Sequence, residues 1–321
     1  MREQPHSAVT GAAGFIGSHL CERLIELGHT VTGVDCLTDY YSLHLKQRNL
    51  KSLREKDRFS FLKIDLTTAD LRHALRNVDF VFHLAAQPGV RGSWGKDFRK
   101  YVRNNIIATQ AVLESLKETK VRKVIHASSS SIYGEEATLP IHESNSPRPI
   151  SPYGVTKLAS ENLCRIYHRS FGIPTVVLRY FTVYGPRQRP DMAFHRFTNN
   201  ALSGSHVVVY GDGNASRDFT YVTDAVEATI LAMEKAEPGE VFNVGSGRSV
   251  AVNEAIAVLE GIMGREIDVR YEEAQRGDVK DTCADIDKVR SALAFQPSKS
   301  LPEGLKEQVQ WQKRLNERPV K

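Results

Sequence analysis

The sequence has few cysteines and no long hydrophobic run. Its four cysteines among 321 residues, Cys21, Cys36, Cys164 and Cys283, stand far apart and form no CxxC pair, which argues against a zinc site or a disulfide scaffold. No segment approaches the roughly 18 apolar residues of a membrane-spanning helix. Residues 1–6 are polar, unlike the apolar core of a secretory signal. We therefore expect a cytoplasmic protein with no metal and no membrane partner.

The sequence also lacks a strong excess of charge of either sign. There are 43 Lys and Arg against 38 Asp and Glu, a net charge of +5. The basic residues form no run and no aromatic stacking motif interleaves them, so nucleic acid is not an expected partner. The mild excess is compatible with an acidic small molecule. With 41% hydrophobic and 25% charged residues, the composition is globular, which excludes disorder and fibrous repeats.

What the sequence does contain is an alternation of β-branched runs and amphipathic segments. This order favours an α/β fold with a doubly wound parallel sheet, covered by helices on both faces. Beyond residue 180 the pattern is less regular, but a helix and a strand there could return to the sheet. The pattern predicts strands at 7–10, 30–34, 59–64, 79–84, 122–128, 174–178 and 241–244, and helices at 15–27, 102–116, 152–171, 225–235, 252–263 and 301–315.

A glycine-rich segment, Gly11 to Gly17, lies between the first strand and the first helix. Glycines at such a turn let the backbone approach a pyrophosphate, and the start of the helix supplies amide donors with partial positive charge. The spacing is GxxGxxG rather than GxGxxG, and an ordinary strand–helix turn is the alternative. The context of strand, loop and helix favours a dinucleotide site.

Asp35 ends the second expected strand, 24 residues after Gly11. A carboxylate at this place can accept hydrogen bonds from ribose hydroxyls and would repel a 2′-phosphate, which favours NAD over NADP. Lys46 and Arg48 lie near enough in the sequence to leave NADP open. Asp65, after the third strand, is placed to meet the adenine.

Ser128 to Ser131 stand at the end of an expected strand, and Tyr153 and Lys157 follow four residues apart near the start of a helix. That spacing puts the tyrosine and the lysine on one helix face. A free tyrosine has a pKa of about 10, and a nearby ammonium lowers it by stabilising the phenolate. With a serine to hold a substrate hydroxyl, the set can relay a proton beside a hydride acceptor. A surface ion-pair helix is the alternative.

These motifs, in this order, resemble the extended short-chain dehydrogenase/reductase superfamily in its NAD-dependent epimerase/dehydratase branch, from Thr10 to about Trp311. The resemblance implies an NAD-binding Rossmann domain over 1–180, to which about 221–247 return, and a smaller α/β domain over 181–220 and 248–315 that binds a nucleotide-sugar. The catalytic Ser/Thr–Tyr–Lys set would be Ser129, Tyr153 and Lys157. The implied NAD contacts are Gly11, Gly14, Phe15, Ile16, Gly17, Asp35, Asp65, Leu84, Ala85, Ala86, Asn104, Ser128, Tyr153, Lys157 and Tyr180.

The two residues after Ser129 bear on the reaction. The family's 4,6-dehydratases have an Asp-Glu pair there, and its UDP-glucuronate decarboxylases have a Glu at the second position, whereas this chain has Ser130 and Ser131. Without this acid or base, the resemblance implies oxidation at C4 of the sugar and its reversal on the opposite face. That reaction is a 4-epimerisation, in which NAD is regenerated at each turnover.

The segments His83–Arg91 and Arg179–Phe194 are similar to UDP-glucuronate 4-epimerases, and Thr182 stands where UDP-galactose 4-epimerases usually have Asn. Arg187 and Arg189 offer two guanidinium groups that can pair with a carboxylate, unless they form a solvated basic loop. A UDP-glucose or UDP-N-acetylhexosamine epimerase and a non-catalytic NAD(P)-binding redox sensor are the alternatives. The implied substrate contacts are Gln87, Arg91, Ser129, Ser130, Ser131, Thr182, Val183, Arg187, Arg189, Met192, Arg217, Arg276 and Asp278.

The resemblance also implies a homodimer, built from two helices of each subunit at about 101–118 and 153–171. Their apolar stripes fit internal packing equally well. His83 is expected to be a buried structural histidine, and Tyr40 and Tyr41 are expected to be packing residues.

Overall fold

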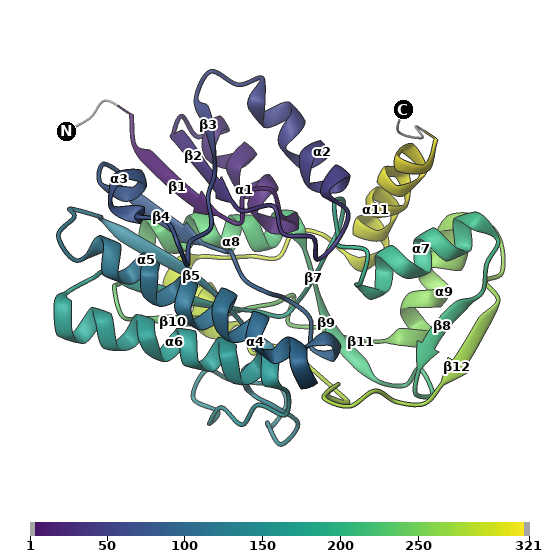
Figure 1. The fold of residues 1–321 in the computed structure, drawn as a ribbon. Helices are drawn as coiled ribbons and strands as arrows, with labels where there is room; N and C mark the ends of the chain where they lie inside the picture. The colour runs from purple at the N-terminus through teal and green to yellow at the C-terminus, as the bar shows by residue number, and fades with distance from the viewer. Residues whose placement is uncertain (1–3, 318–321) are drawn as a thin grey trace.

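A seven-stranded parallel sheet forms the centre of the computed structural model, which describes residues 4–317 (Figure 1). The strand order is β10-β6-β5-β4-β1-β2-β3, and every neighbouring pair runs parallel. The predicted α/β fold is therefore confirmed, including the return of the late strand β10 beside β6. The strands are β1 (His6–Thr10), β2 (Thr30–Asp35), β3 (Phe59–Lys63), β4 (Phe80–His83), β5 (Lys123–Ser129), β6 (Thr175–Tyr180) and β10 (Val241–Val244).

Helices cover both faces of this sheet, because successive residues of each strand point to opposite sides. Ala8, Val81 and Val124 belong to one buried cluster, whereas their neighbours Val9 and Phe82 belong to another. One face carries α1 (Phe15–Glu26), α2 (Leu43–Arg54) and α8 (Val222–Lys235), and the other carries α3 (Leu71–Leu75), α5 (Ala108–Leu116) and α6 (Pro152–Phe171).

The helix expected at 102–116 begins four residues earlier and is not regular. It consists of α4 (Phe98–Tyr101), a π-helical turn at Val102–Ile107 and then α5. Asn105 is the buried residue of the π-helical turn. Such bulges are frequent at functional sites, because they aim side chains that a regular helix would direct elsewhere.

Two small sheets and several helices make up most of the chain beyond β6. The irregular stretch expected after Thr182 contains the helix α7, and the stretch 265–285, expected to be extended, contains one strand, β12. The elements are β7 (Thr182–Tyr184), β9 (Ser216–Tyr221) and β11 (Ser249–Ala251) in one sheet, β8 (Val207–Tyr210) and β12 (Val269–Glu272) in the other, and α7 (Ala193–Ser203), α9 (Val252–Met263), α10 (Asp287–Leu293) and α11 (Leu301–Asn316).

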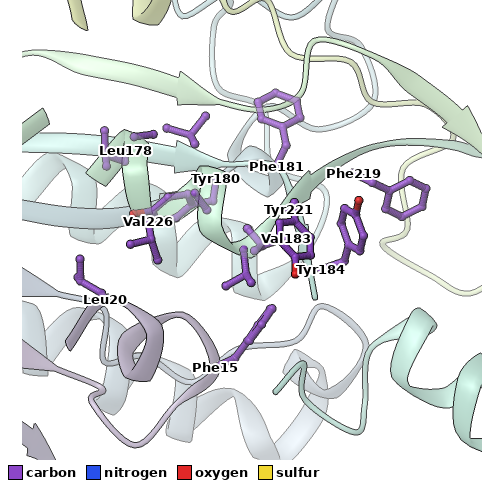
Figure 2. Close-up of a cluster of buried hydrophobic side chains, with 14 of the residues drawn as sticks. Phe15, Leu20, Leu178, Tyr180, Phe181, Val183, Tyr184, Phe219, Tyr221 and Val226 are labelled. Carbon is purple, nitrogen blue, oxygen red and sulfur yellow. The ribbon is translucent and has the colours of Figure 1, made fainter. Parts of the chain in front are cut away.

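An aromatic cluster joins the large sheet to the small ones (Figure 2). Phe15 and Tyr180 belong to it on one side and Tyr184, Phe219 and Tyr221 on the other, all at most 7% exposed. The rings of Tyr184 and Tyr221 meet edge to face at 5.4 Å. Burying each such side chain contributes about 1.5–3 kcal/mol. This packing fixes the path of the chain where it passes from β6 to β7.

Among the described residues, no helix is long and apolar enough to cross a membrane. Over the same part of the chain, no group of three or more His, Cys, Asp or Glu side chains is arranged to hold a metal ion.

Candidate active site

A cavity of about 840 Å³ runs along the carboxyl ends of the parallel strands to the small sheets. In open α/β sheets, ligands bind at this edge. The cavity brings together most of the residues that the sequence singled out. Those on its wall are Gly11, Gly14, Phe15, Ile16, Gly17, Asp35, Asp65, Leu84, Ala85, Ala86, Arg91, Asn104, Ser128, Ser129, Ser130, Ser131, Tyr153, Lys157, Tyr180, Thr182, Val183, Arg189, Met192, Arg217 and Asp278.

The glycine loop leaves no room for side chains. Gly11 has a φ of +77°, and a Cβ there would lie 2.9 Å from the backbone nitrogen of Ala85. A Cβ on Gly17 would lie 2.2 Å from the carbonyl oxygen of Gly11. The helix α1 begins directly after Gly14, which offers no side chain to cap it. Its first amides can therefore serve an anion, and the loop fits the pyrophosphate of a dinucleotide.

Asp35 stands at the end of β2 where a ribose is expected. Its carboxylate accepts hydrogen bonds from the backbone N–H of Ala13 (3.2 Å) and of Leu37 (2.8 Å), and burial raises its pKa. Lys46 donates to the carbonyl and the hydroxyl of Thr38, at 2.7 and 3.0 Å, so its ammonium is already held by protein groups. This arrangement fits NAD better than NADP.

Tyr153 and Lys157 lie one turn apart at the start of α6, which begins as the sequence predicted. Ser151 accepts from the N–H of Gly154 at 3.1 Å, and Pro152 occupies the first turn. The Lys157 ammonium donates to the carbonyl of Ala127, and burial lowers its pKa to about 8. The group is therefore largely charged at pH 7.

The hydroxyl of Tyr153 meets Ser129. Burial raises the pKa of Tyr153, while hydrogen bonding with Ser129 and the positive charge of Arg189 act in the opposite direction. Ser129 also accepts from the N–H of Ser131 at 3.2 Å. A buried phenol beside a hydroxyl and a guanidinium is suited to take and return a proton.

Ser128 serves a different purpose from its neighbour Ser129. Its hydroxyl donates to Glu161 at 3.0 Å, and the same carboxylate forms a buried ion pair with Arg179. This pair ties together β5, β6 and α6, and β5 and α6 carry Ser129, Tyr153 and Lys157.

The π-helical turn places two asparagines at the site. Asn104, the predicted one, lies on the cavity wall. Asn105 accepts from the N–H of Gln87 at 2.6 Å and donates to its carbonyl at 3.1 Å and to the hydroxyl of Thr156 at 2.9 Å. Gln87 is buried and lies outside the cavity lining, so it shapes the loop after β4 rather than the wall. Asn105 was missed, although two successive asparagines on one helix were a signal.

Also on the cavity wall, Arg189 forms two hydrogen bonds with Asp191, both at 3.0 Å. Tyr40 donates to the same carboxylate at 3.2 Å. Tyr40 and Tyr41, expected to be packing residues, both lie on the cavity wall. Asp191, which lies between β7 and α7, was therefore missed at the level of sequence. The role of the tyrosine pair was also missed, because the loop after β2 carries no motif that places it at the cavity.

Elsewhere on the cavity wall, Arg91 pairs with Asp278 at 2.6 Å and lies over the ring of Tyr210, 4.2 Å from its centroid. Arg217 donates to the carbonyl of Ser216, and burial lowers its pKa. A side chamber of about 140 Å³ opens beside this region. It shares Ser130, Ser131, Thr182, Arg217 and Asp278 with the main cavity.

The model of the NAD dependent epimerase/dehydratase family matches residues 8–245. The chain belongs to this family. It is 46% identical to an uncharacterized UDP-glucose epimerase of Bacillus subtilis (94% of this chain, 96% of the relative) and 39% identical to a UDP-glucuronate 4-epimerase of Thermodesulfobacterium geofontis (95% of each). Its fold is similar to that of the UDP-glucuronic acid 4-epimerase from Bacillus cereus in complex with UDP-glucuronic acid and NAD, with a TM-score of 0.94, 46% identity, and coverage of 97% of this chain and 99% of that one.

Within this epimerase/dehydratase fold, two arginines predicted to contact substrate lie elsewhere. Arg187 is absent from the cavity lining, and its guanidinium pairs with Glu22 of α1 at 2.8 Å. The backbone of Arg187 has a φ of +67°, which turns the side chain away from the cavity. Arg276 lies in an exposed loop and is also absent from the lining.

The histidine of β4 has the structural role expected for it. His83 is 2% exposed and hydrogen-bonds to Thr10 at 2.8 Å and to Thr109 at 3.0 Å. Burial and the charge of Lys157 lower its pKa to about 3. It therefore stays neutral at physiological pH and is not suited to proton transfer there.

Proposed function

We propose that this protein is an isomerase that interconverts UDP-glucuronate and UDP-galacturonate by 4-epimerisation with bound NAD. The observation that carries the proposal is the meeting of Tyr153, Ser129 and Arg189 in one cavity. The similarity to the UDP-glucuronic acid 4-epimerase of Bacillus cereus supports the same substrate.

The proton chemistry is assigned to three side chains. Tyr153 takes the proton of the C4 hydroxyl and later returns it, and Ser129 holds that hydroxyl. The charged Lys157 favours the phenolate form of Tyr153. NAD, when bound, supplies the hydride acceptor and donor at C4. The residues that fit it are those of the glycine loop, Asp35 and Asn104.

Ser130 and Ser131 restrict what else can happen at the site. The hydroxyl of a serine is a poor acid or base at neutral pH, so neither residue can drive elimination of water from the sugar. Inversion at C4 requires the keto sugar to turn over within the cavity, whose volume is about 840 Å³.

Arg189 is proposed to bind the C5 carboxylate. A guanidinium can pair with a carboxylate through two hydrogen bonds, as Arg189 already does with Asp191. Ser130 and Ser131 are proposed as neutral donors to the same group. Holding the carboxylate in the plane of the ring keeps the bond to C5 poorly aligned for cleavage and so suppresses loss of CO₂ from the 4-keto acid.

The test combines a substrate comparison with product purity. The wild-type enzyme is incubated with UDP-glucuronate, UDP-glucose and UDP-N-acetylglucosamine, and we expect the first to be turned over best. Arg189→Ala and Ser130→Ala are then expected to release CO₂ and a UDP-pentose, whereas Arg72→Ala, on the exposed side of α3, is not. Unchanged product purity in both variants would show that these residues do not protect the carboxylate.

We also propose that the protein is a homodimer that joins through α4 to α6. Large apolar side chains are exposed on these helices, namely Phe98 (37%), Ile107 (47%), Val155 (47%), Ile166 (48%) and Phe171 (52%). Three of them lie on α6 and two on α4 and the π-helical turn, which lead into α5, and α5 lies beside α6 (Figure 1). Exposed apolar residues gathered on neighbouring helices are typical of an interface.

We further propose a cytoplasmic location, which is supported by the four unpaired cysteines.

A further inference from the structure

The segment Gly185–Arg189, which follows β7, carries two arginines that point in opposite directions. Arg189 lies on the cavity wall, and Arg187 reaches α1. A left-handed conformation at Arg187, with a φ of +67°, separates them. This conformation is strained for a residue with a side chain and persists where surrounding contacts hold it.

The contacts that hold it come from α1, the helix that begins at the glycine loop. The Arg187 guanidinium donates to the hydroxyl of Ser18 at 3.2 Å and to Glu22 at 2.8 Å. The side chains of Arg187 and Glu22 are 20% and 29% exposed, so the pair is largely shielded from water. The residue after Ser18 in α1 is His19, whose Nε2 lies 3.0 Å from the carbonyl oxygen of Pro186. A carbonyl can only accept, so the Nε2 of His19 carries the proton.

The other side of the segment is hydrogen-bonded to the helices α7 and α11. Gln188 accepts from the backbone N–H of His195 (2.9 Å) and from the side chain of Gln308 (2.8 Å). Gln308 in turn accepts from the N–H of Gly185 at 2.9 Å. The segment is thus held between α7 and α11 on one side and α1 on the other, and Arg189 projects from its end.

We propose that Arg187 is a positioning residue that fixes Arg189 relative to α1, and so sets the sugar carboxylate in register with the dinucleotide. The inference rests on the proposed function, because it takes Arg189 as the ligand of the carboxylate. Displacing a substrate-positioning group by about 1 Å can cost roughly 100-fold in rate. A planar guanidinium that bridges Ser18 and Glu22 resists such a displacement better than a single contact.

The test measures dissociation constants for UDP-glucuronate and for UDP, which lacks the sugar, on the NAD-loaded protein. Arg187→Gln is expected to weaken UDP-glucuronate about 10-fold and to leave UDP within a factor of two. Glu22→Gln, which keeps the shape of the side chain, is expected to give a smaller loss of the same kind. The double variant is expected to be no worse than Arg187→Gln alone, because both remove one interaction.

The matched control is Arg23→Gln on the same helix. Arg23 pairs with Glu26 and Glu227, and within residues 4–317 it forms no side-chain hydrogen bond or ion pair with the segment. It is expected to bind both ligands as the wild type does. Equal losses for UDP-glucuronate and UDP in Arg187→Gln would indicate general loosening and overturn the inference, as would no loss at all.

Turnover by the wild type tests the proposed function, whereas binding by Arg187→Gln tests the role of Arg187. If the wild type does not turn over UDP-glucuronate, the proposed function fails and the inference falls with it. If the wild type does so while Arg187→Gln binds UDP-glucuronate normally, the inference alone is overturned.

Discussion

At the scale of single residues, Tyr153 differs from its neighbour Tyr101 in what surrounds the hydroxyl. The two rings meet edge to face at 6.2 Å. Tyr101 donates to the carbonyl of Pro88 at 3.0 Å, whereas the hydroxyl of Tyr153 meets Ser129 and is acted on by the charge of Arg189. The same type of side chain therefore supports the backbone at one position and is the proposed proton carrier at the other.

We expect Tyr153→Phe to lower kcat by roughly 100- to 10,000-fold, the usual contribution of a general acid–base. Binding of UDP should change little, because the ring remains. The matched control Tyr101→Phe loses one hydrogen bond to the backbone and should retain kcat within a few-fold. Steady-state kinetics and UDP titration of both variants check this. A Tyr153→Phe variant with near-normal kcat would exclude this residue as the proton carrier.

Single residues also show where the sequence was not enough. The types and spacing of Ser129, Tyr153 and Lys157 predict a proton relay, because a relay needs those groups at one strand end and one helix turn. The direction of Arg187 depended on one backbone angle and on partners in α1, which lie 165 positions away from it. A contact between positions so far apart cannot be predicted from the residues next to Arg187 in the sequence.

At the scale of elements, the glycine loop between β1 and α1 has no room for a side chain at Gly17. A Cβ at Gly17 would lie 2.2 Å from the carbonyl oxygen of Gly11. Gly17→Ala is therefore expected to displace the loop and to yield protein with little bound NAD, measured by absorbance after denaturation. Gly261→Ala in α9 is the control, since nothing lies within 4 Å of the added methyl. It should keep NAD and gain about 0.5–1 kcal/mol of stability. Normal NAD content in Gly17→Ala would contradict the assignment of the loop.

Two neighbouring strands, β4 and β5, carry buried histidines in register, His83 and His126, whose rings lie 5.4 Å apart. Burial lowers the pKa of both, to about 3 for His83. The unfolded chain binds their protons near pH 6.5 and the folded chain does not, so stability is lost as pH falls below 6.5. Each such histidine contributes a slope of up to about 1.4 kcal/mol per pH unit.

Urea unfolding between pH 7 and pH 4 measures this slope. His83→Gln should reduce it by the contribution of one proton, whereas His73→Gln, at an exposed position of α3, should leave it unchanged. A stability independent of pH across this window would contradict the structural role of the pair.

Elements were predictable where local signals were strong. The bounds of α6 followed from Ser151 and Pro152, and those of α9 from its regular apolar spacing. The helix α7 was missed because its sequence, AFHRFTNNALS, is largely polar and aromatic. The π-helical turn around Asn105 could not be foreseen, because Asn105 binds Gln87 and Thr156 from other elements. The two-part division of the chain at about residue 180 stays a prediction.

At the scale of the whole molecule, the proposed dimer gives a direct prediction. Ile166 on α6 and Ile107 at the end of the π-helical turn are about half exposed. We expect the wild type to elute as a dimer in size-exclusion chromatography with light scattering, and Ile166→Glu to shift it to a monomer. Leu43→Glu, at an exposed position of α2, should leave the dimer intact. A monomeric wild type at micromolar concentration would refute this interface.

The proposed epimerisation uses a cofactor that we expect the protein to retain through purification. Purified protein, with no added NAD, is incubated with UDP-glucuronate and followed by proton NMR. We expect signals of UDP-galacturonate to appear and to reach a constant ratio with those of UDP-glucuronate, without free 4-keto sugar or UDP-pentose. If UDP-glucuronate is left unchanged even after NAD is supplied, while UDP-glucose is epimerised, the assignment of the carboxylate substrate is wrong.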